Sequence, residues 1–265
     1  PKNSGCFGPI KVIAPPGTIL NVDFPAPEVG GNTETHCKIA GTVIGALSTP
    51  LPEKTMAAEG ATHTNFVFGG YDSAADEAFV CYAIELSGWG GRSFADGNDA
   101  TDSINGNCRV IPVEVFETRF PLQCEKFELV QDSGGAGLHR GGLSTTRVIK
   151  STSTEITGSQ MSDRHANRPW GLYGGQPGGT AGTWFSPANS DDWQGIDTAF
   201  NKVSPSKWSN VTIRPGDSIR FQTPGGGGWG DPKKRPREQV KEDLAEGYIS
   251  KGAAEEIYGL NIVKE

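Results

Sequence analysis

Closely spaced cysteine pairs are absent from this sequence. Its 265 residues hold five cysteines without a CxxC motif: Cys6, Cys37, Cys81, Cys108 and Cys124. A disulfide scaffold or a zinc knuckle needs an even, closely spaced set, so neither class fits. We expect reduced thiols in a cytoplasmic protein.

Positive charge and long apolar runs are also scarce. The net charge is -7 at pH 7, and the only basic run, residues 233–237, lies beside two prolines and before acidic residues. Because nucleic-acid binding requires clustered Lys and Arg to replace counterions, we predict no nucleic-acid partner. No apolar run approaches the roughly 20 residues of a membrane-spanning helix, and no signal peptide is visible, so we expect no membrane association.

The common phosphate-binding and serine-nucleophile motifs are missing too. Neither GxxxxGK[ST] nor GxSxG occurs. The string TPGGGGWGDP lacks the GxGxxG spacing, and Pro232 and Pro236 interrupt the segment after it. We therefore predict no nucleotide site in this chain alone. We expect the four glycines to make a tight loop that turns through positive φ and approaches a neighbour closely.

Metal ligands and catalytic residues do not cluster along the sequence. None of the four histidines takes part in an HxH or HExxH pair; they are His36, His63, His139 and His165. No complete metal site is predicted within the chain, which leaves only the donation of one ligand to a shared site. Cys108 has no histidine near it in sequence, so a packed thiol is favoured over a nucleophile.

Glycine and proline, in contrast, are abundant, with 37 and 18 residues spread among apolar runs. We predict a β-rich α+β fold with mixed or antiparallel sheets, one longer helix and short C-terminal helices. Residues 1–231 are expected to form the core, and residues 232–265 a short helical extension that packs on the core or on a partner. The expected elements are a strand–turn–strand at 6–25, a helix at 33–48, strands at 64–72, 78–87, 110–130 and 145–150, an irregular stretch at 181–210, a strand pair at 211–223 and helices at 236–246 and 250–258.

A long polar loop follows the second of these strands, at residues 88–109. Connections of this length often carry function. Short carboxylates and amides beside glycines usually make turns and caps; the alternative is that they line a substrate cavity shared with a partner. On that alternative, the residues nearest to substrate are Arg92, Asp102, Asn105 and Arg109.

The order of the segments resembles the C-terminal half of the hydantoinase B family. The matching strings run from about residue 3 to residue 260 and include GCFGPIKVIAPPGTILN, SGWGGRSFADGNDA, PVEVFETRFPL, DSGGAGLHRGGL, RPWGLYGGQPG and TPGGGGWGDP. DSGGAGLHRGGL and TPGGGGWGDP in this order and spacing are highly specific. Since the chain opens with Pro1 and Lys2 rather than Met, we expect a processed, proteolysed or split polypeptide.

The resemblance implies that the chain works inside an enzyme complex. In that family ATP with Mg is bound by a partner of the hydantoinase A type, which phosphorylates the carbonyl substrate, and the N-terminal half of the B-type chain holds a divalent metal. That half is missing here, so we expect no cofactor in this chain and no activity of the chain alone. The expected partners are the A-type chain and the N-terminal half, with room for a small accessory subunit.

Three functions remain open. Our main expectation is a subunit or processed fragment of an ATP-dependent ketone carboxylase of the acetone or acetophenone carboxylase type, forming part of the wall of a shared active site. The alternatives are a hydantoinase- or oxoprolinase-type cyclic amide hydrolase and a purely structural assembly module. The string DSINGNCRVIPVE lacks the histidine that oxoprolinase-like members carry there, which weakens the oxoprolinase interpretation.

Overall fold

The computed structural model describes residues 3–261 and divides into two compact units at residues 31 and 32. The first unit contains a short 3-10 helix, Ser4–Phe7, and a single bridge between Thr18 and Asn21. The strand–turn–strand predicted at 6–25 is therefore wrong. Its prolines lack the N–H group that a ladder requires, and the apolar side chains of this unit are largely exposed.

The second unit begins with the predicted long helix. A π-helical turn, Gly31–Thr35, continues directly into α1, His36–Leu47. Cys37 is its fully buried residue, and a Cβ on Gly45 would lie 2.9 Å from the Trp170 ring. The helix at 33–48 is thus confirmed, and one of its glycines permits close packing against an indole.

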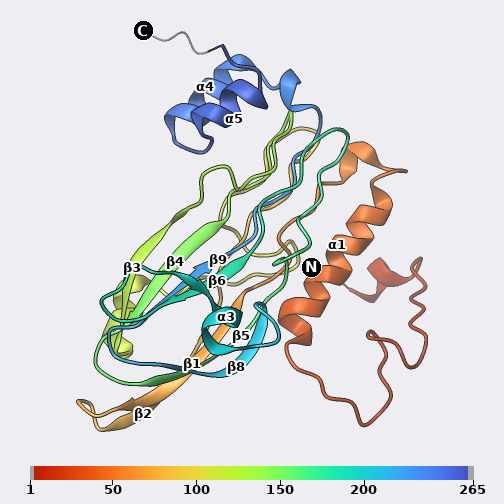
Figure 1. Cartoon of the computed structure of the whole chain (residues 1–265). Helices are drawn as coiled ribbons and strands as arrows, with labels where there is room; N and C mark the ends of the chain where they lie inside the picture. The colour runs from red at the N-terminus through yellow and green to blue at the C-terminus, as the bar shows by residue number, and fades with distance from the viewer. Residues whose placement is uncertain (1–2, 262–265) are drawn as a thin grey trace. The chain divides into compact units, whose positions relative to one another are not determined.

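Two antiparallel sheets form the body of this unit (Figure 1). The first has the order β2-β1-β5-β8 and the second β3-β4-β9-β6-β7. The strands are β1 (Asn65–Asp72), β2 (Glu77–Ala83), β3 (Leu122–Leu129), β4 (Thr145–Ser151), β5 (Ile156–Met161), β6 (Gly182–Ser186), β7 (Gln194–Gly195), β8 (Lys207–Ile213) and β9 (Ser218–Gln222).

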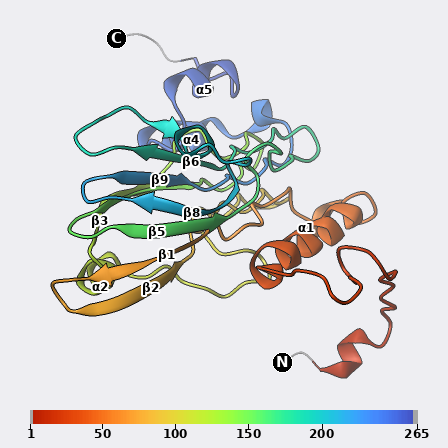
Figure 2. The same cartoon turned by 60° about the horizontal axis from the view of Figure 1, so that its bottom comes forward.

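The main hydrophobic core lies between the two sheets, which are stacked in Figure 2. Alternate residues of a strand point to the same face, so Phe66 and Phe68 of β1 both enter the core. The Phe66 ring lies 4.5 Å from that of Phe221 on β9, across the interface between the sheets. Burying each such side chain contributes roughly 1.5–3 kcal/mol. The β-rich α+β prediction is confirmed, with antiparallel sheets.

A short helix replaces part of the strand predicted at 110–130. α2 spans Val113–Arg119 and is followed by β3. The string VEVFETR alternates like a strand, but Phe116 and Phe120 are four residues apart and their rings both contact Phe68. Spacing of i and i+4 matches one face of a helix, and burial of this pair decides the local structure.

The predictions for 181–223 also need correction. Residues 181–210 are not irregular, because β6, β7, α3 (Ile196–Phe200) and the start of β8 lie there. β8 and β9 do exist, but they belong to different sheets rather than to one hairpin. The turn at 214–217 therefore crosses from one sheet to the other. Polar composition hid these elements, although Ile196 is fully buried in the core.

Beyond the sheets, extended glycine-rich segments pack directly against one another, and Figure 1 shows them running as thin ribbons from the strands toward α4 and α5. Consecutive amides Gly226–Gly228 donate to three different segments, as expected of a chain with three residues per turn such as polyproline II. Their acceptors, at 2.7–2.9 Å, are the carbonyls of Gly142, Ala58 and Gln176. We call this region the glycine bundle; its segments are residues 56–62, 87–91, 97–101, 134–142, 170–179 and 224–230.

These positions require glycine because neighbouring backbones approach closely, and not because the chain turns there. A Cβ on Gly226 would lie 1.8 Å from the carbonyl oxygen of Trp89, and one on Gly90 would lie 1.8 Å from that of Ala57. Within the run 225–228, no φ is positive; Gly230 alone in TPGGGGWGDP has that conformation. The predicted close contact is confirmed, and the predicted tight turn is wrong.

Two short helices close the described chain, α4 (Arg237–Ala245) and α5 (Lys251–Glu256), as predicted. The Ser250 side chain caps α5 by accepting from the Ala253 amide. Arg235 forms ion pairs with Asp243 of α4 and with Asp96 of the polar loop. The boundary proposed between residues 231 and 232 remains a prediction.

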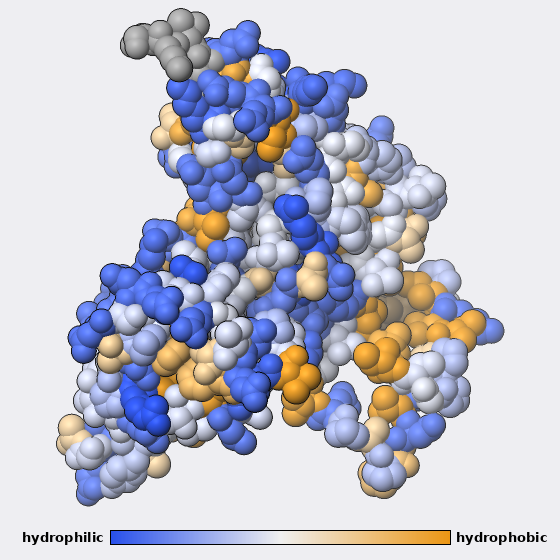
Figure 3. Space-filling model, viewed as in Figure 1, coloured by the Kyte–Doolittle hydropathy of each residue, from blue (hydrophilic) through white to orange (hydrophobic). Residues whose placement is uncertain are grey.

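The helices described in residues 3–261 are each too short or too polar to cross a bilayer. The face of the molecule drawn in Figure 3 is largely hydrophilic, with scattered apolar patches. Two further 3-10 turns, Pro52–Lys54 and Pro232–Lys234, complete the elements. Cytoplasmic localisation remains a prediction.

Adding one methyl group inside the glycine bundle should be severely destabilising. Gly226→Ala should lower the free energy of unfolding by at least about 3 kcal/mol, because the clash is with backbone that cannot rotate away. The matched control is Gly41→Ala on α1, where nothing lies within 4 Å of the added Cβ; it should gain up to about 1 kcal/mol. Urea unfolding of both variants measures this, and equal stabilities would contradict the packing argument.

Candidate functional site

Three neighbouring segments of the glycine bundle, residues 56–62, 87–91 and 97–101, lead into a buried polar cluster. Gly60 donates its amide to the Gly88 carbonyl, and Ser87 and Thr101 exchange backbone hydrogen bonds. This pairing places His63, which follows the first segment, beside Asp102, which follows the third. His63 Nε2 lies 2.7 Å from Asp102 Oδ1, and both side chains are nearly inaccessible to solvent.

Both nitrogens of His63 face hydrogen-bond acceptors. Nε2 meets the Asp102 carboxylate, while Nδ1 lies 2.6 Å from the Thr33 carbonyl oxygen and 3.6 Å from Cys37 Sγ. The hydrogen bond with Cys37, joined by those with Thr33 and by the Asp102 charge, raises the pKa of His63 to about 9 against the effect of burial. In the absence of any bound ion, the ring is therefore an imidazolium at neutral pH.

Cys108 lies at the exposed edge of this cluster. Its amide donates to Asp102 Oδ2 at 2.5 Å, and its Sγ lies within 4.8 Å of the ligand atoms of His63 and Asp102. The prediction treated Cys108 as isolated because no histidine is close in sequence; the fold brings one beside it. The two ring nitrogens of His63 face the Asp102 carboxylate and the Thr33 carbonyl oxygen, so neither is directed at the Cys108 thiol as the base of a cysteine nucleophile would be.

Glu34 closes the inner side of the cluster. Its carboxyl group accepts hydrogen bonds from Thr62 Oγ1, the His63 amide and Asn65 Nδ2 at 2.6–3.2 Å. Burial raises the pKa of Glu34 to about 7, against the effect of the Thr62 hydrogen bond. The π-helical turn that precedes α1 is what aims this side chain inward.

A small cavity of about 180 Å³ lies next to the cluster, between α1 and the start of the glycine bundle. Lys38, Glu59 and Arg164 supply its charged walls, and Trp170 supplies an apolar one. Burial, together with the Arg164 charge, lowers the pKa of Lys38 to about 8. Burial also raises the pKa of Glu59, whose carboxyl group accepts from Ser103 Oγ and the Ile104 amide. The cavity thus combines the positive charges of Lys38 and Arg164 with the carboxyl group of Glu59. Burial disfavours the charged form of that carboxyl group.

Two of the four predicted site residues lie at this cluster. Asp102 forms its centre, and Asn105 Nδ2 donates to the His36 carbonyl at 3.3 Å. Arg92 instead donates to the Asp96 carbonyl and to Asn98 Oδ1, and stacks on Phe94. Arg109 is exposed. The structure therefore brings Asp102 and Asn105 together at the cluster. Arg92 binds other residues of the loop instead.

The residues that sequence reasoning missed come from outside the loop. Glu34, Lys38 and His63 lie far before the loop residues that they approach. The charged residues Glu34 and Lys38, four apart at the start of an otherwise apolar helix, are the one local signal that could have pointed to them. His63 offers none, since only the pairing of bundle segments reveals its partner.

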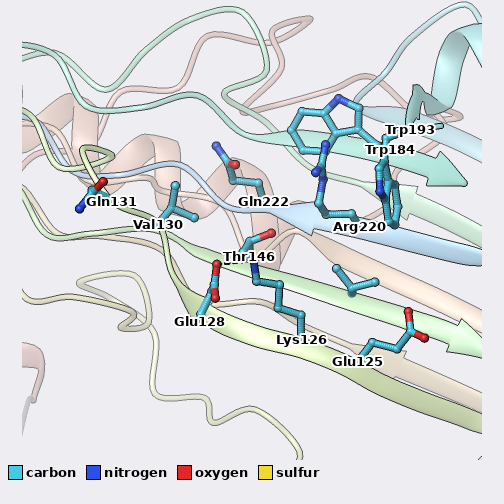
Figure 4. Close-up of a pocket in the computed structure, with 11 residues that line it drawn as sticks. Glu125, Lys126, Glu128, Val130, Gln131, Thr146, Trp184, Trp193, Arg220 and Gln222 are labelled. Atoms are coloured by element: carbon cyan, nitrogen blue, oxygen red, sulfur yellow. Dashed lines mark ion pairs between the residues drawn. The ribbon is translucent and has the colours of Figure 1, made fainter. Parts of the chain in front are cut away.

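A separate groove of about 610 Å³ lies on the outer face of the second sheet (Figure 4). The Arg220 guanidinium lies between two indoles, 4.4 Å from the ring centre of Trp184 and 4.9 Å from that of Trp193. Glu125 and Glu128 lie across from it. Neither cysteine nor histidine occurs among the described residues that line the groove.

Comparison with known proteins identifies the family. A model described as hydantoinase B/oxoprolinase matches residues 1–232. The chain belongs to the hydantoinase B/oxoprolinase family. Within it, the B chain of a D-/L-hydantoinase of Pseudomonas sp. (strain NS671) is 31% identical over 263 residues, covering 99% of this chain and 42% of that protein. The resemblance seen in the sequence is thereby confirmed.

Solved structures share the fold of this chain. The crystal structure of the ATP-dependent caprolactamase from Pseudomonas jessenii covers 95% of it with a TM-score of 0.82 and 24% identity. The nucleotide-free structure of acetone carboxylase covers 80% with a TM-score of 0.65 and 22% identity. The chain spans about two fifths of the length of its curated hydantoinase relative and of the caprolactamase chain.

His165, in the loop that carries Asp163 and Arg164, makes stability depend on pH. Burial and the nearby Lys207 charge lower its pKa from 6.5 to about 4, against the charges of Asp163 and Asp197. As pH falls, the unfolded chain takes up this proton first, so stability is lost between pH 6.5 and about 4, by up to about 3 kcal/mol. His165→Gln should remove this part of the pH dependence in urea unfolding. An unchanged slope in that range would contradict the assignment.

Proposed function

We propose that this chain is a component of an ATP-dependent enzyme that hydrolyses the amide bond of a cyclic amide. The observation that carries the proposal is the hydantoinase relative, 31% identical over 99% of the chain. The caprolactamase, named for a lactam substrate, adds support through its fold. Our first expectation, ketone carboxylation, has weaker support, since the acetone carboxylase resembles the chain less closely and over less of its length.

The site geometry is compatible with a wall of a shared active site. Lys38 and Arg164 place two positive charges on the wall of the 180 Å³ cavity. Such charges stabilise negative oxygen that develops on a carbonyl or a phosphoryl group, provided that water is kept out. Lys38 Nζ is held by the carbonyl oxygens of Gly60 and Ala61, so its position is fixed before a substrate arrives.

Asp102 and Asn105 are, in this proposal, the loop residues nearest to substrate. Asp102 holds His63 in place and accepts from the amides of Ser103 and Cys108. Asn105 is exposed beside it and ties the loop to the start of α1. The pair fixes the geometry at the rim of the cluster, where another chain could complete the cavity.

A partner is also part of the proposal. We infer that ATP with Mg is bound by a hydantoinase A-type chain and that the N-terminal half of a B-type chain completes the site, because the relatives are described as subunits and are longer than this chain. The segment 3–31 adds physical support. It exposes a run of large apolar side chains, as surfaces covered by other chains do; they are Phe7, Ile10, Val12, Ile13, Ile19, Leu20, Val22, Phe24 and Val29.

Substrate-dependent ATP turnover tests the reaction. The complex that contains the chain is isolated, its composition is determined by native mass spectrometry, and ATP hydrolysis is measured with a lactam, a hydantoin, or a ketone plus bicarbonate. We expect the cyclic amides to stimulate turnover. Stimulation by the ketone alone would replace the proposal with carboxylation, and a stable monomer without partners would leave the assembly role unsupported.

Asp102→Asn should lower turnover of the assembled complex by about 100-fold. The amide no longer balances the His63 charge, and a displacement of reacting groups by about 1 Å lowers the rate by about 100-fold. Assembly should be unchanged. Asp192→Asn, at an exposed acidic residue, is the control and should retain wild-type turnover. Wild-type rates in the Asp102 variant would remove this residue from the site.

A further inference from the structure

We propose that His63, Asp102 and Cys108 together bind one divalent ion of the zinc class. The metal implied by the family resemblance lies in the N-terminal half of a B-type chain. The three ligands of the site proposed here all belong to this chain.

The three side chains offer ligand atoms of the right kind at nearly the right spacing. The ligand atoms all lie within 4.8 Å of one another, and His63 Nε2 is 2.7 Å from Asp102 Oδ1. Zinc binds nitrogen, oxygen and sulfur at about 2.0–2.3 Å, so tetrahedral ligands lie roughly 3–4 Å apart. Cys108 is exposed, and the proposal requires its side chain to rotate toward the other two ligand atoms.

The surrounding hydrogen bonds hold the ligands as metal sites require. A metal-bound histidine usually donates its second ring N–H to a carbonyl or carboxylate, which fixes the ring and its tautomer. His63 Nδ1 has such a partner in the Thr33 carbonyl oxygen at 2.6 Å, which leaves Nε2 directed toward Asp102. The Asp102 carboxylate is fixed in turn by the amides of Ser103 and Cys108.

The donor set selects the class of metal. One imidazole, one carboxylate and one thiolate suit zinc or cobalt, whereas magnesium and calcium prefer oxygen ligands alone. Three protein ligands leave one tetrahedral position open, as in zinc sites that bind water or a substrate carbonyl oxygen. The exposed side of Cys108 gives an ion access to that position from solvent.

Cobalt binding to the full chain tests the site directly. The protein is treated with a chelator, dialysed and titrated with Co²⁺. We expect one ion per chain, the visible bands of four-coordinate cobalt and a thiolate-to-cobalt charge-transfer band. Cys108→Ser should abolish the charge-transfer band, and His63→Ala should weaken binding by more than about 100-fold.

Two other thiols provide matched controls. Cys6→Ser and Cys124→Ser change free cysteines outside the cluster and should retain both the affinity and the spectrum. Binding without a thiolate band, or an unchanged spectrum in Cys108→Ser, would overturn the proposal. Because Cys108 is exposed, its variant decides the matter even if His63→Ala fails to fold. No step of this test uses turnover, so it stands apart from the proposed amide hydrolysis.

Discussion

Direct contact between backbones in the glycine bundle is the constraint on which the rest of the structure depends. The carbonyl oxygen of Trp89 occupies the place that a Cβ of Gly226 would need. The segments are held in register mainly by amide-to-carbonyl hydrogen bonds, with the Arg140–Asp99 ion pair joining two of them. Two of these segments deliver His63 and Asp102 to the same point, so the geometry of the candidate site is set by the packing of glycines.

The polar cluster is costly to bury and is stabilised by mutual pairing. Isolated charges in an apolar interior are strongly unfavourable, and pairing with hydrogen bonds offsets only part of that cost. Here His63 faces Asp102, Glu34 accepts from three donors, and Lys38 is held by backbone carbonyls. Several of these groups have strongly shifted pKa values beside a cavity, an arrangement that is typical of functional sites.

Local patterns were enough to predict the strands β1, β2 and β4, the long helix and the two C-terminal helices, because burial on one face leaves a period in the sequence. They failed where tertiary contacts override the pattern: VEVFETR alternates like a strand, yet it forms a helix whose buried Phe116 packs against Phe120 at the C-cap. Asp102 and Asn105 could be proposed as site residues because they lie in a long polar loop. Their partner His63 could not be, since the contact between them depends on bundle segments distant in sequence.

The composition of the glycine bundle also limits how this protein can change by mutation. Any single-nucleotide change of a glycine codon that alters the residue adds at least a Cβ atom, and at Gly88, Gly90, Gly142 and Gly226 that atom would fall within 2.0 Å of a backbone atom. Every such missense change is thus expected to meet the same clash, whatever the chemistry of the new side chain. The support that positions His63 and Asp102 is thus expected to tolerate almost no substitution at these four glycines.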